Sequence, residues 1–122
     1  MHLKPTTDNA IRILQHLHKH QKLQSGVYIA KAVGISYTLF MRIAAKLKEG
    51  GILAATHGRN GGFSLKRPAA EISLYDVYAC MEGDLHLSEL KKESGCPMGD
   101  YIGTLQADIA KSMSAKSIAE LA

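Results

Sequence analysis

The stretch "GRNGGFSLKRP", residues 58–68, constrains the fold of this chain more than any other. Asn60-Gly61 is the dipeptide that a tight hairpin turn with positive φ favours. Short runs that suit strands flank it, "ILAATH" at 52–57 and "FSLKR" at 63–67. The sequence therefore predicts two short antiparallel strands joined by a narrow, glycine-rich tip.

Three helices are expected before this hairpin. The first carries an apolar stripe of Ala10, Ile13, Leu14 and Leu17, and Thr7 or Asp8 can cap its start. The second opens at Ser25 and has an inner face of Ile29, Ala30 and Val33. The third runs from about Tyr37 to Lys48 and ends at Gly50-Gly51, with an inner face of Leu39, Phe40, Ile43 and Leu47.

The segment "VGIS" predicts the turn between the second and third helices. Gly34 supplies the flexible position, Ile35 fills the core, and Ser36 caps the third helix. Helix, short glycine turn and helix form a helix-turn-helix motif. With the hairpin after it, the expected fold is mainly α with a small β-hairpin, a winged helix-turn-helix.

Charge divides the chain into two halves. Residues 1–67 hold 11 Lys and Arg against two acids, a net charge of +9, whereas residues 68–122 hold four Lys against nine acids, a net charge of −5. A basic half joined to an acidic half indicates a polyanion partner for the first half alone. The alternative is charge that serves only solubility.

In a winged helix the third helix enters the DNA major groove, and the hairpin reaches the flanking backbone or minor groove. The outward face of the third helix is expected to be Tyr37, Thr38, Met41, Arg42, Ala45 and Lys46, which includes no acid. The predicted contacts to double-stranded DNA are Ser36, Tyr37, Thr38, Arg42, Lys46, His57, Arg59 and Asn60. The alternatives are a solvated helix face and an ordinary basic hairpin.

The second half predicts a short helix, a loop and a long helix. Ser73 and Asp76 have capping-box spacing before a helix over 74–82, and residues 83–95 form a polar loop. The long helix starts at Pro97 and carries an apolar stripe of Met98, Ile102, Leu105, Ile109 and Met113. A stripe beyond the core favours pairing with a second copy, so a homodimer is expected. Ser117 and Glu120 suggest a last helical turn.

The predicted organisation is a winged helix over 1–82, a sensor-type loop over 83–96 and a dimerisation helix over 97–122. No apolar run approaches the roughly 20 residues of a membrane span, and the start of the chain lacks a signal peptide's apolar core. We therefore expect a cytoplasmic protein. Two cysteines make no disulfide framework. No nucleophile–base pair or phosphate-binding loop is evident, so an enzyme is not expected.

The order "TTDNAIRIL", "IAKAVGIS", "LKEGGIL", "GRNGGFSLKRPAAEISLYDVYACMEG" and "CPMG" resembles the Rrf-two family of bacterial transcription regulators along nearly the whole chain. That family includes the iron–sulfur cluster regulator, the nitric-oxide-sensing repressor and the cysteine-metabolism repressor. The resemblance implies a homodimeric, sequence-specific DNA-binding regulator, expected to be a repressor acting on a near-palindromic operator. The alternative is a winged-helix module that docks on a partner enzyme.

Many members of that family hold an iron–sulfur cluster with three cysteines before the long helix. This chain matches only the last of them, Cys96, because Cys80 lies earlier, in a helix where we expect it to be core. No cluster is therefore expected. A mixed-ligand cluster is the alternative, since Asp8 matches the position of a partner-chain aspartate ligand and His86 lies in the loop.

Cys96 is a candidate for sensing without a cluster. It directly precedes Pro97, so its thiol would lie at a helix N-terminus, where the helix dipole favours thiolate. Cys96 and His86 are thus the residues expected to respond to a redox, thiol or metabolite signal. His16 and His20 have a spacing that metals can use, but no thiolate or carboxylate is near them in sequence, and no metal site is predicted.

Overall fold

The structure is a computed structural model, and residues 2–121 are described. Helices α1 (Pro5–His20), α2 (Gly26–Val33) and α3 (Tyr37–Glu49) come first, and strands β1 (Leu53–Thr56) and β2 (Gly62–Leu65) follow. The chain continues through η1 (Ala69–Glu71), α4 (Leu74–Glu82), η2 (Glu89–Lys92) and α5 (Pro97–Ser114). The fold is mainly α with one hairpin, and the predicted winged helix is confirmed.

The helix-turn-helix forms as the glycine turn predicts. The axes of α2 and α3 are bent by 108° at their junction, within the range usual for this motif. Gly34 takes a left-handed φ of 86° and Ile35 packs against the core. The hydroxyl of Ser36 accepts a hydrogen bond from the Leu39 N–H at 3.1 Å, so the predicted cap of α3 is confirmed.

One core holds the three helices and the hairpin together. Its fully buried side chains include Ile13, Leu14, Ile29, Phe40, Ile43, Leu47, Ile52 and Leu53. Phe40 of α3 meets Phe63 of β2 edge-to-face, with ring centroids 5.1 Å apart. Hydrophobic burial therefore holds α3 and the base of the hairpin in the same core.

The expected cap of α1 is wrong. The helix begins one turn earlier, at Pro5, whose fixed φ suits a first helical position, and Lys4 precedes it without a side-chain cap. Thr7 is instead fully buried, and its hydroxyl donates a hydrogen bond to Glu82 at 2.5 Å. Asp8 lies exposed in the first turn, where its charge suits the helix dipole.

The hairpin has the predicted strands but a different tip. Leu53 pairs with Leu65, and Thr56 pairs with Gly62. The Gly61 N–H donates to the Gly58 carbonyl at 3.1 Å, and among the tip residues before Gly62 only Gly58 has a positive φ, 107°. The predicted positive-φ turn at Asn60-Gly61 is therefore wrong, because the longer loop reverses at Gly58 instead.

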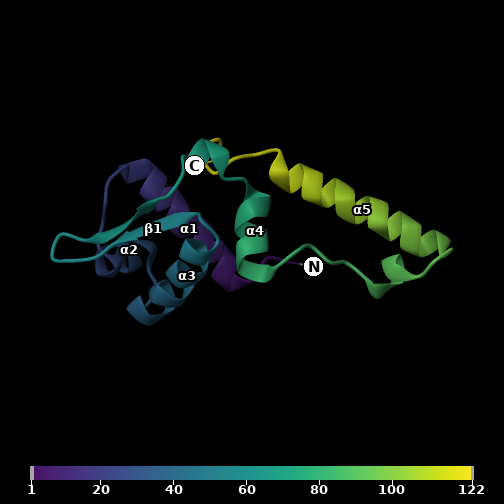
Figure 1. Ribbon diagram of the computed structural model, residues 1–122, viewed down its shortest axis with the longest axis horizontal. Helices are drawn as coiled ribbons and strands as arrows, with labels where there is room; N and C mark the ends of the chain where they lie inside the picture. Colours follow the sequence, from purple (N-terminus) through teal and green to yellow (C-terminus); the bar gives the residue numbers. More distant parts are fainter. Residues whose placement is uncertain (1, 122) are drawn as a thin grey trace.

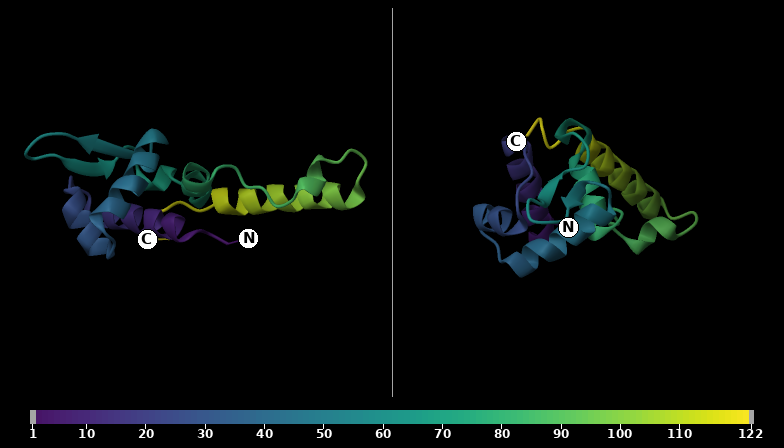
Figure 2. Two further views of the ribbon diagram at one scale, coloured as in Figure 1. Left: turned by 90° about the horizontal axis from the view of Figure 1, so that it is seen from below. Right: turned by 60° about the vertical axis from the view of Figure 1, so that its left-hand side comes forward.

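Helix α4 joins the winged helix to a long arm (Figures 1 and 2). The predicted capping box forms, since Ser73 and Asp76 each accept a hydrogen bond from the other's backbone N–H at 3.0 Å. Beyond it the chain runs outward to η2, a short helix inside the expected polar loop, and returns along α5. Helix α5 contacts α4 and η2, and a small second cluster of Tyr78, Leu85 and Met113 lies between them.

The last described residues do not continue the dimerisation helix predicted over 97–122. Helix α5 ends at Ser114, Ser117 forms an isolated β-bridge with Ser73, and residues 118–121 form a turn. The Ile118 N–H donates to the Ile72 carbonyl at 2.8 Å, and the Ile118 side chain is buried in the main core. The expected helical turn forms only as a hydrogen-bonded turn over 118–121, although Ser117 and Glu120 each accept a hydrogen bond from the other's backbone N–H. The segment packs back onto the winged helix. Positions 1 and 122 lie outside the described residues.

Candidate nucleic-acid interface

The outer face of α3 is exposed as the sequence predicts. Tyr37, Thr38, Met41, Arg42, Ala45 and Lys46 are all exposed, while Phe40, Ile43, Ala44 and Leu47 of the same helix are buried. The chain contains no Asp or Glu between Asn9 and Lys48. The surface around this helix therefore favours an anionic ligand over most of its length.

Two of the predicted contact residues also have structural roles. The Ser36 hydroxyl already caps α3, and Lys46 Nζ donates to the Met81 carbonyl of α4 at 3.4 Å. Lys46 is thus directed toward α4, which the sequence did not indicate because the contact spans 35 positions. Thr38 and Arg42 are exposed and lie nearer the N-terminal end of α3 than Lys46 does.

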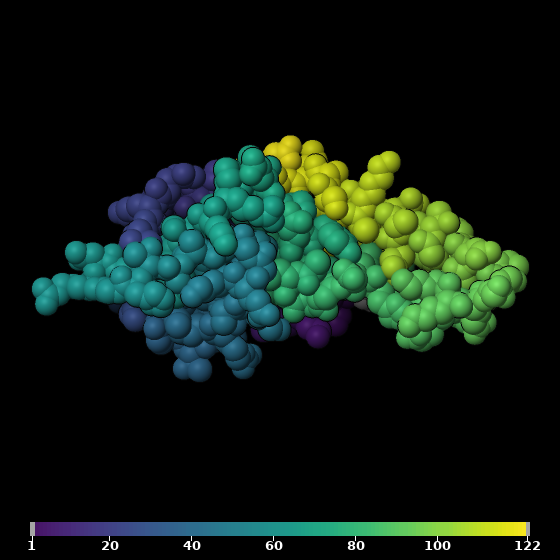
Figure 3. Space-filling view, viewed as in Figure 1, coloured from purple at the N-terminus to yellow at the C-terminus, as the bar shows by residue number. Residues whose placement is uncertain are grey.

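The hairpin tip, residues 57–61, projects from the body as a narrow arm (Figure 3). His57, Arg59 and Asn60 are all exposed there. A Cβ at Gly61 would collide with the Thr56 carbonyl, so glycine keeps the tip narrow. The tip extends from the same end of the molecule as α2 and α3 (Figure 1). This arrangement presents one helix face and one cationic arm together.

Gln24 anchors the hairpin, and sequence reasoning missed it. Its N–H donates to the Phe63 carbonyl at 3.2 Å, and its carbonyl accepts from the Phe63 N–H at 2.7 Å. Its side-chain oxygen lies 2.6 Å from His16 Nε2, and its side-chain nitrogen is buried without a partner among the described residues. A lone glutamine in a polar loop carries no pattern that could have revealed this bridge.

His16 and His20 do lie side by side, with ring centroids 4.4 Å apart. Burial, then the neighbouring His16, Lys19 and Lys22, lower the pKa of His20, so these surroundings oppose added positive charge. In the described part of the chain, no group of three or more His, Cys, Asp or Glu side chains is arranged to hold a metal ion.

Asp8, His86 and Cys96, the residues weighed as mixed cluster ligands, do not form a metal-holding group within the described part of one chain. Cys96 is the N-cap of α5, and its sulfur accepts a hydrogen bond from the Gly99 N–H at 3.3 Å. His86 lies on the loop, 3.1 Å from the Glu89 carboxylate. Asp8 is exposed on α1. Cys96 lies at a helix N-terminus, as the sequence predicted.

Cys80 is not simply core as expected. It is partly exposed at the edge of the main core, and its thiol donates to the Lys46 carbonyl at 3.1 Å, at the end of α3. Burial raises the pKa of the Cys80 thiol, so the thiol rather than the thiolate is favoured. This cysteine therefore completes the C-terminal end of α3 and is a poor ligand.

No single helix among the described residues is long and apolar enough to cross a membrane. The pair α2 and α3 reaches that composition only when the two helices are taken together across their bend.

Residues 3–122 match the Rrf2 family, described as an iron-dependent transcriptional regulator. Protein aau3 of Rhizobium meliloti is 35% identical over 94% of this chain and 76% of its own length. The HTH-type transcriptional regulator NsrR of Oceanobacillus iheyensis is 33% identical over 73% of this chain and 62% of its own length.

The solved structure of CymR, the global cysteine regulator of B. subtilis, has a TM-score of 0.83 at 17% identity and covers 99% of this chain and 95% of its own. That likeness supports the fold. The family match does not favour either an enzyme or the alternative of a docking module. The chain belongs to the Rrf2 family, and it is a DNA-binding transcription regulator.

Proposed function

We propose that this protein is a homodimeric repressor that binds a near-palindromic operator through α3 and the hairpin tip. The observation that carries the proposal is the acid-free, exposed face of α3 at the same end of the molecule as the narrow cationic tip. A repressor of this kind acts by occupying DNA, so it works in the bacterial cytoplasm. The resemblance to named repressors supports repression rather than activation.

Each part of the interface has a distinct role in this proposal. Arg42 reads a guanine edge from the major groove, and Thr38 contacts phosphate or a thymine methyl group. Arg59 at the hairpin tip meets phosphate or sits in the narrow minor groove, where negative potential is concentrated. Contacts from α3 thus give sequence specificity, and the contact from the hairpin tip adds affinity.

The test uses duplexes that the wild-type protein selects from a random-sequence pool. Arg42→Ala is expected to cost about 1–3 kcal/mol on the selected sequence and to relax discrimination at one position. Arg59→Ala is expected to weaken binding to all sequences and to reduce the salt slope by about 1. Arg12→Ala, which removes an exposed arginine from α1, is the matched control.

Failure to enrich any sequence from the pool would contradict operator binding. If Arg42→Ala weakens every sequence equally, Arg42 contacts phosphate instead of a base. Wild-type affinity and salt slope in Arg59→Ala would remove the tip from the interface.

The homodimer rests on the arm formed by α5. Met98, Tyr101 and Leu105 are 60%, 64% and 40% exposed, although they are large and apolar. Pairing with a second copy would cover them and would set two recognition helices on one side of DNA, a helical turn or a multiple apart. Half-sites at that spacing make the operator a near-palindrome.

Leu105→Glu tests the dimer, because it would bury an unpaired carboxylate in the interface. We expect light scattering to show monomer, with operator affinity falling in parallel. Ala107→Glu adds the same charge at an exposed position outside the stripe and should remain dimeric. A wild-type protein that is monomeric at micromolar concentration would remove the dimer from the proposal.

The cofactor proposal is that no conventional three-cysteine iron–sulfur cluster is bound. The donor set does not fit one, since the loop before α5 offers Cys96 alone and the Cys80 thiol is engaged with the Lys46 carbonyl. We propose instead that Cys96 and the loop residue His86 respond to a redox, thiol or metabolite signal. The test is iron and sulfide content with the visible spectrum after anaerobic purification, and stoichiometric iron and sulfide would overturn it.

A further inference from the structure

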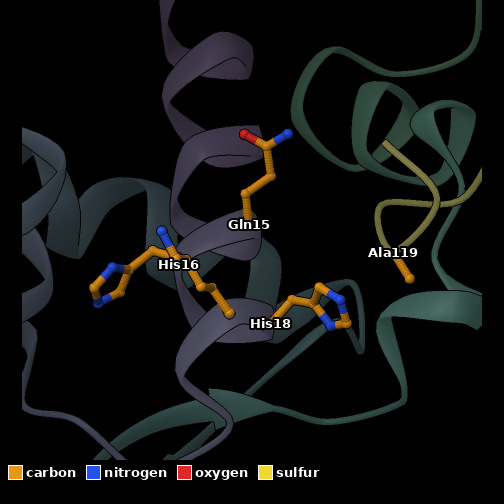
Figure 4. A pocket seen from close by; sticks show the side chains of 5 residues that line it. Gln15, His16, His18 and Ala119 are labelled. Atoms are coloured by element: carbon orange, nitrogen blue, oxygen red, sulfur yellow. The ribbon is translucent and has the colours of Figure 1, made fainter. Parts of the chain in front are cut away.

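A continuous groove runs along the C-terminal half of α1, away from the outer face of α3. Three adjoining hollows form it. The first and second share His18 and Ala119, and the second and third share Gln21 and Leu65. In Figure 4 the His18 ring points from α1 toward the segment that carries Ala119, whereas the His16 ring points to the opposite side of the helix. The groove therefore lies between α1, β2 and the C-terminal turns.

The groove is lined by basic side chains. Its lining includes His18, Lys19, Lys22, Lys66 and Arg67. No Asp or Glu is among the described residues that line the three hollows. Arg67 is 3.4 Å from the Asp76 carboxylate, but the three lysines form no salt bridge with a described residue. Unneutralised lysines along a groove favour a polyanionic ligand.

The position of the hairpin indicates where this groove would lie on DNA. Strand β1 contacts α3, whereas β2 contacts α1, so the hairpin lies between the outer helix and the groove. In Figure 1 the C-terminal end of α1 and helix α3 likewise lie on opposite sides of the hairpin. When the tip enters a minor groove, one phosphate strand passes on the α3 side and the other passes on the α1 side.

We infer that the groove formed by α1 and β2 is a second phosphate-binding surface, which contacts the DNA strand across the minor groove from α3. This inference rests on the proposed function and extends its footprint. Lys19, Lys22 and Lys66 act as point charges that bind phosphate without reading bases. The hairpin tip is then held between two backbone contacts, which fixes how far it enters the minor groove.

The test removes the three lysines together, as Lys19→Ala, Lys22→Ala and Lys66→Ala in one protein. The matched control removes three lysines from the other half of the chain, as Lys91→Ala, Lys92→Ala and Lys116→Ala. Both proteins and the wild type bind the duplex that the wild type selects from a random-sequence pool. Affinity is measured against salt concentration, and hydroxyl-radical cleavage maps the protected sugars.

In the groove variant we expect the salt slope to fall by about 0.9 for each phosphate that the protein no longer neutralises, and by less than about 0.5 in the control. Protection should disappear only from the strand beyond the minor groove, and the preferred sequence should be unchanged. A wild-type slope and footprint in the groove variant would overturn the inference, as would an equal reduction in the control. Failure of the wild type to select DNA would instead overturn the proposed function.

Discussion

The two halves of this chain bury their apolar stripes to different extents. In the winged helix, the inner face of α3 is closed on all sides, and Phe40, Ile43 and Leu47 are each 0% exposed. In the arm, α5 has a stripe of similar spacing, yet Leu105 remains 40% exposed. Among residues 2–121, the second cluster has three buried side chains, Tyr78, Leu85 and Met113.

This difference shows what helical periodicity specifies. A stripe at helical spacing predicts that a face is covered, but it does not identify what covers it. For α3 the cover is α1, α2, β1 and α4 of the same chain. For α5 the main contacts among the described residues are with α4 and η2. Charge follows a similar division. Residues 1–67, which include α3, are net basic, and residues 68–122, which include α5, are net acidic.

The largest expected effect is a difference in stability between substitutions in the buried core of the winged helix and on the exposed apolar stripe of α5. Phe40→Ala should cost about 3–5 kcal/mol of unfolding free energy, because it leaves a cavity beside Phe63 in a site without solvent access. Leu105→Ala should cost under about 1 kcal/mol at protein concentrations where the chain is monomeric. Urea unfolding measures both, and equal costs would show that α5 is closed within one chain.

Glycine substitutions give the next largest effect, and with opposite signs in the two halves. A Cβ at Gly62 would collide with the Gln24 carbonyl, so Gly62→Ala should cost about 1–3 kcal/mol by forcing the hairpin off its anchor. Gly103 in α5 has no neighbouring atom within 4 Å of such a Cβ. Gly103→Ala should stabilise the monomer by about 0.5–1 kcal/mol through helix propensity.

Thermal unfolding of the two variants checks this pair. Gly62→Ala should also weaken DNA binding, because the Gln24 bridge sets the position of the tip. A harmless Gly62→Ala would mean that the hairpin and the loop before α2 move independently.

Features encoded by neighbouring residues were predicted from the sequence. The caps Ser25 and Ser36, the capping box of Ser73 and Asp76, and the start of α5 at Pro97 all depend on residues within one turn of a helix end. Local rules are enough there, because the partner groups are only two or three positions away. The outward face of α3 follows from the same periodicity.

Features that depend on distant partners were not predicted. Thr7 looks like a cap until Glu82, 75 positions away, is seen to accept its hydrogen bond. The Gln24–Phe63 bridge, the Lys46 contact to Met81 and the Cys80 contact to Lys46 are of the same kind. Sequence spacing carries no signal for such pairs, so the exposed face of α3 and the hairpin were predicted while the residues that support them were missed.

The hydrogen bonds of Glu82, at the end of α4, make a smaller and pH-dependent contribution to the free energy of unfolding. Burial alone would raise the pKa of Glu82, but hydrogen bonds from the Thr7 hydroxyl and the Lys4 N–H outweigh it and leave that pKa below its ordinary 4.5. A lowered pKa in the folded state means that the stabilisation is complete above pH 4.5 and is lost as pH falls through the folded value.

Glu82→Gln keeps an oxygen acceptor but removes the charge, so it should cost about 1 kcal/mol at neutral pH. The difference from the wild type should shrink as pH falls below 4.5, when Glu82 itself becomes protonated. Urea unfolding at several pH values measures this, with Glu93→Gln at an exposed loop position as the control. A cost that is independent of pH would assign the effect to packing instead of to the carboxylate.

The smallest expected changes in stability come from substitutions at two helix caps, Ser36 of α3 and Cys96 of α5. Ser36→Ala removes the oxygen that caps α3 and should cost about 1 kcal/mol. Cys96→Ser replaces a weak sulfur acceptor at the start of α5 with a better oxygen acceptor, so its stability should change by less than about 0.5 kcal/mol. Unfolding curves of both variants check this order.

Because Cys96→Ser preserves the cap, it isolates the chemistry of the thiol. Peroxide or a thiol-reactive oxidant should lower operator binding by the wild type, and Cys96→Ser should resist that effect while binding normally beforehand. Cys80→Ser is the matched control, since the pKa of the Cys80 thiol is raised by burial and its thiol is bonded to the Lys46 carbonyl. If Cys80→Ser confers the resistance instead, the responsive thiol lies behind α3, in the closed half of the molecule.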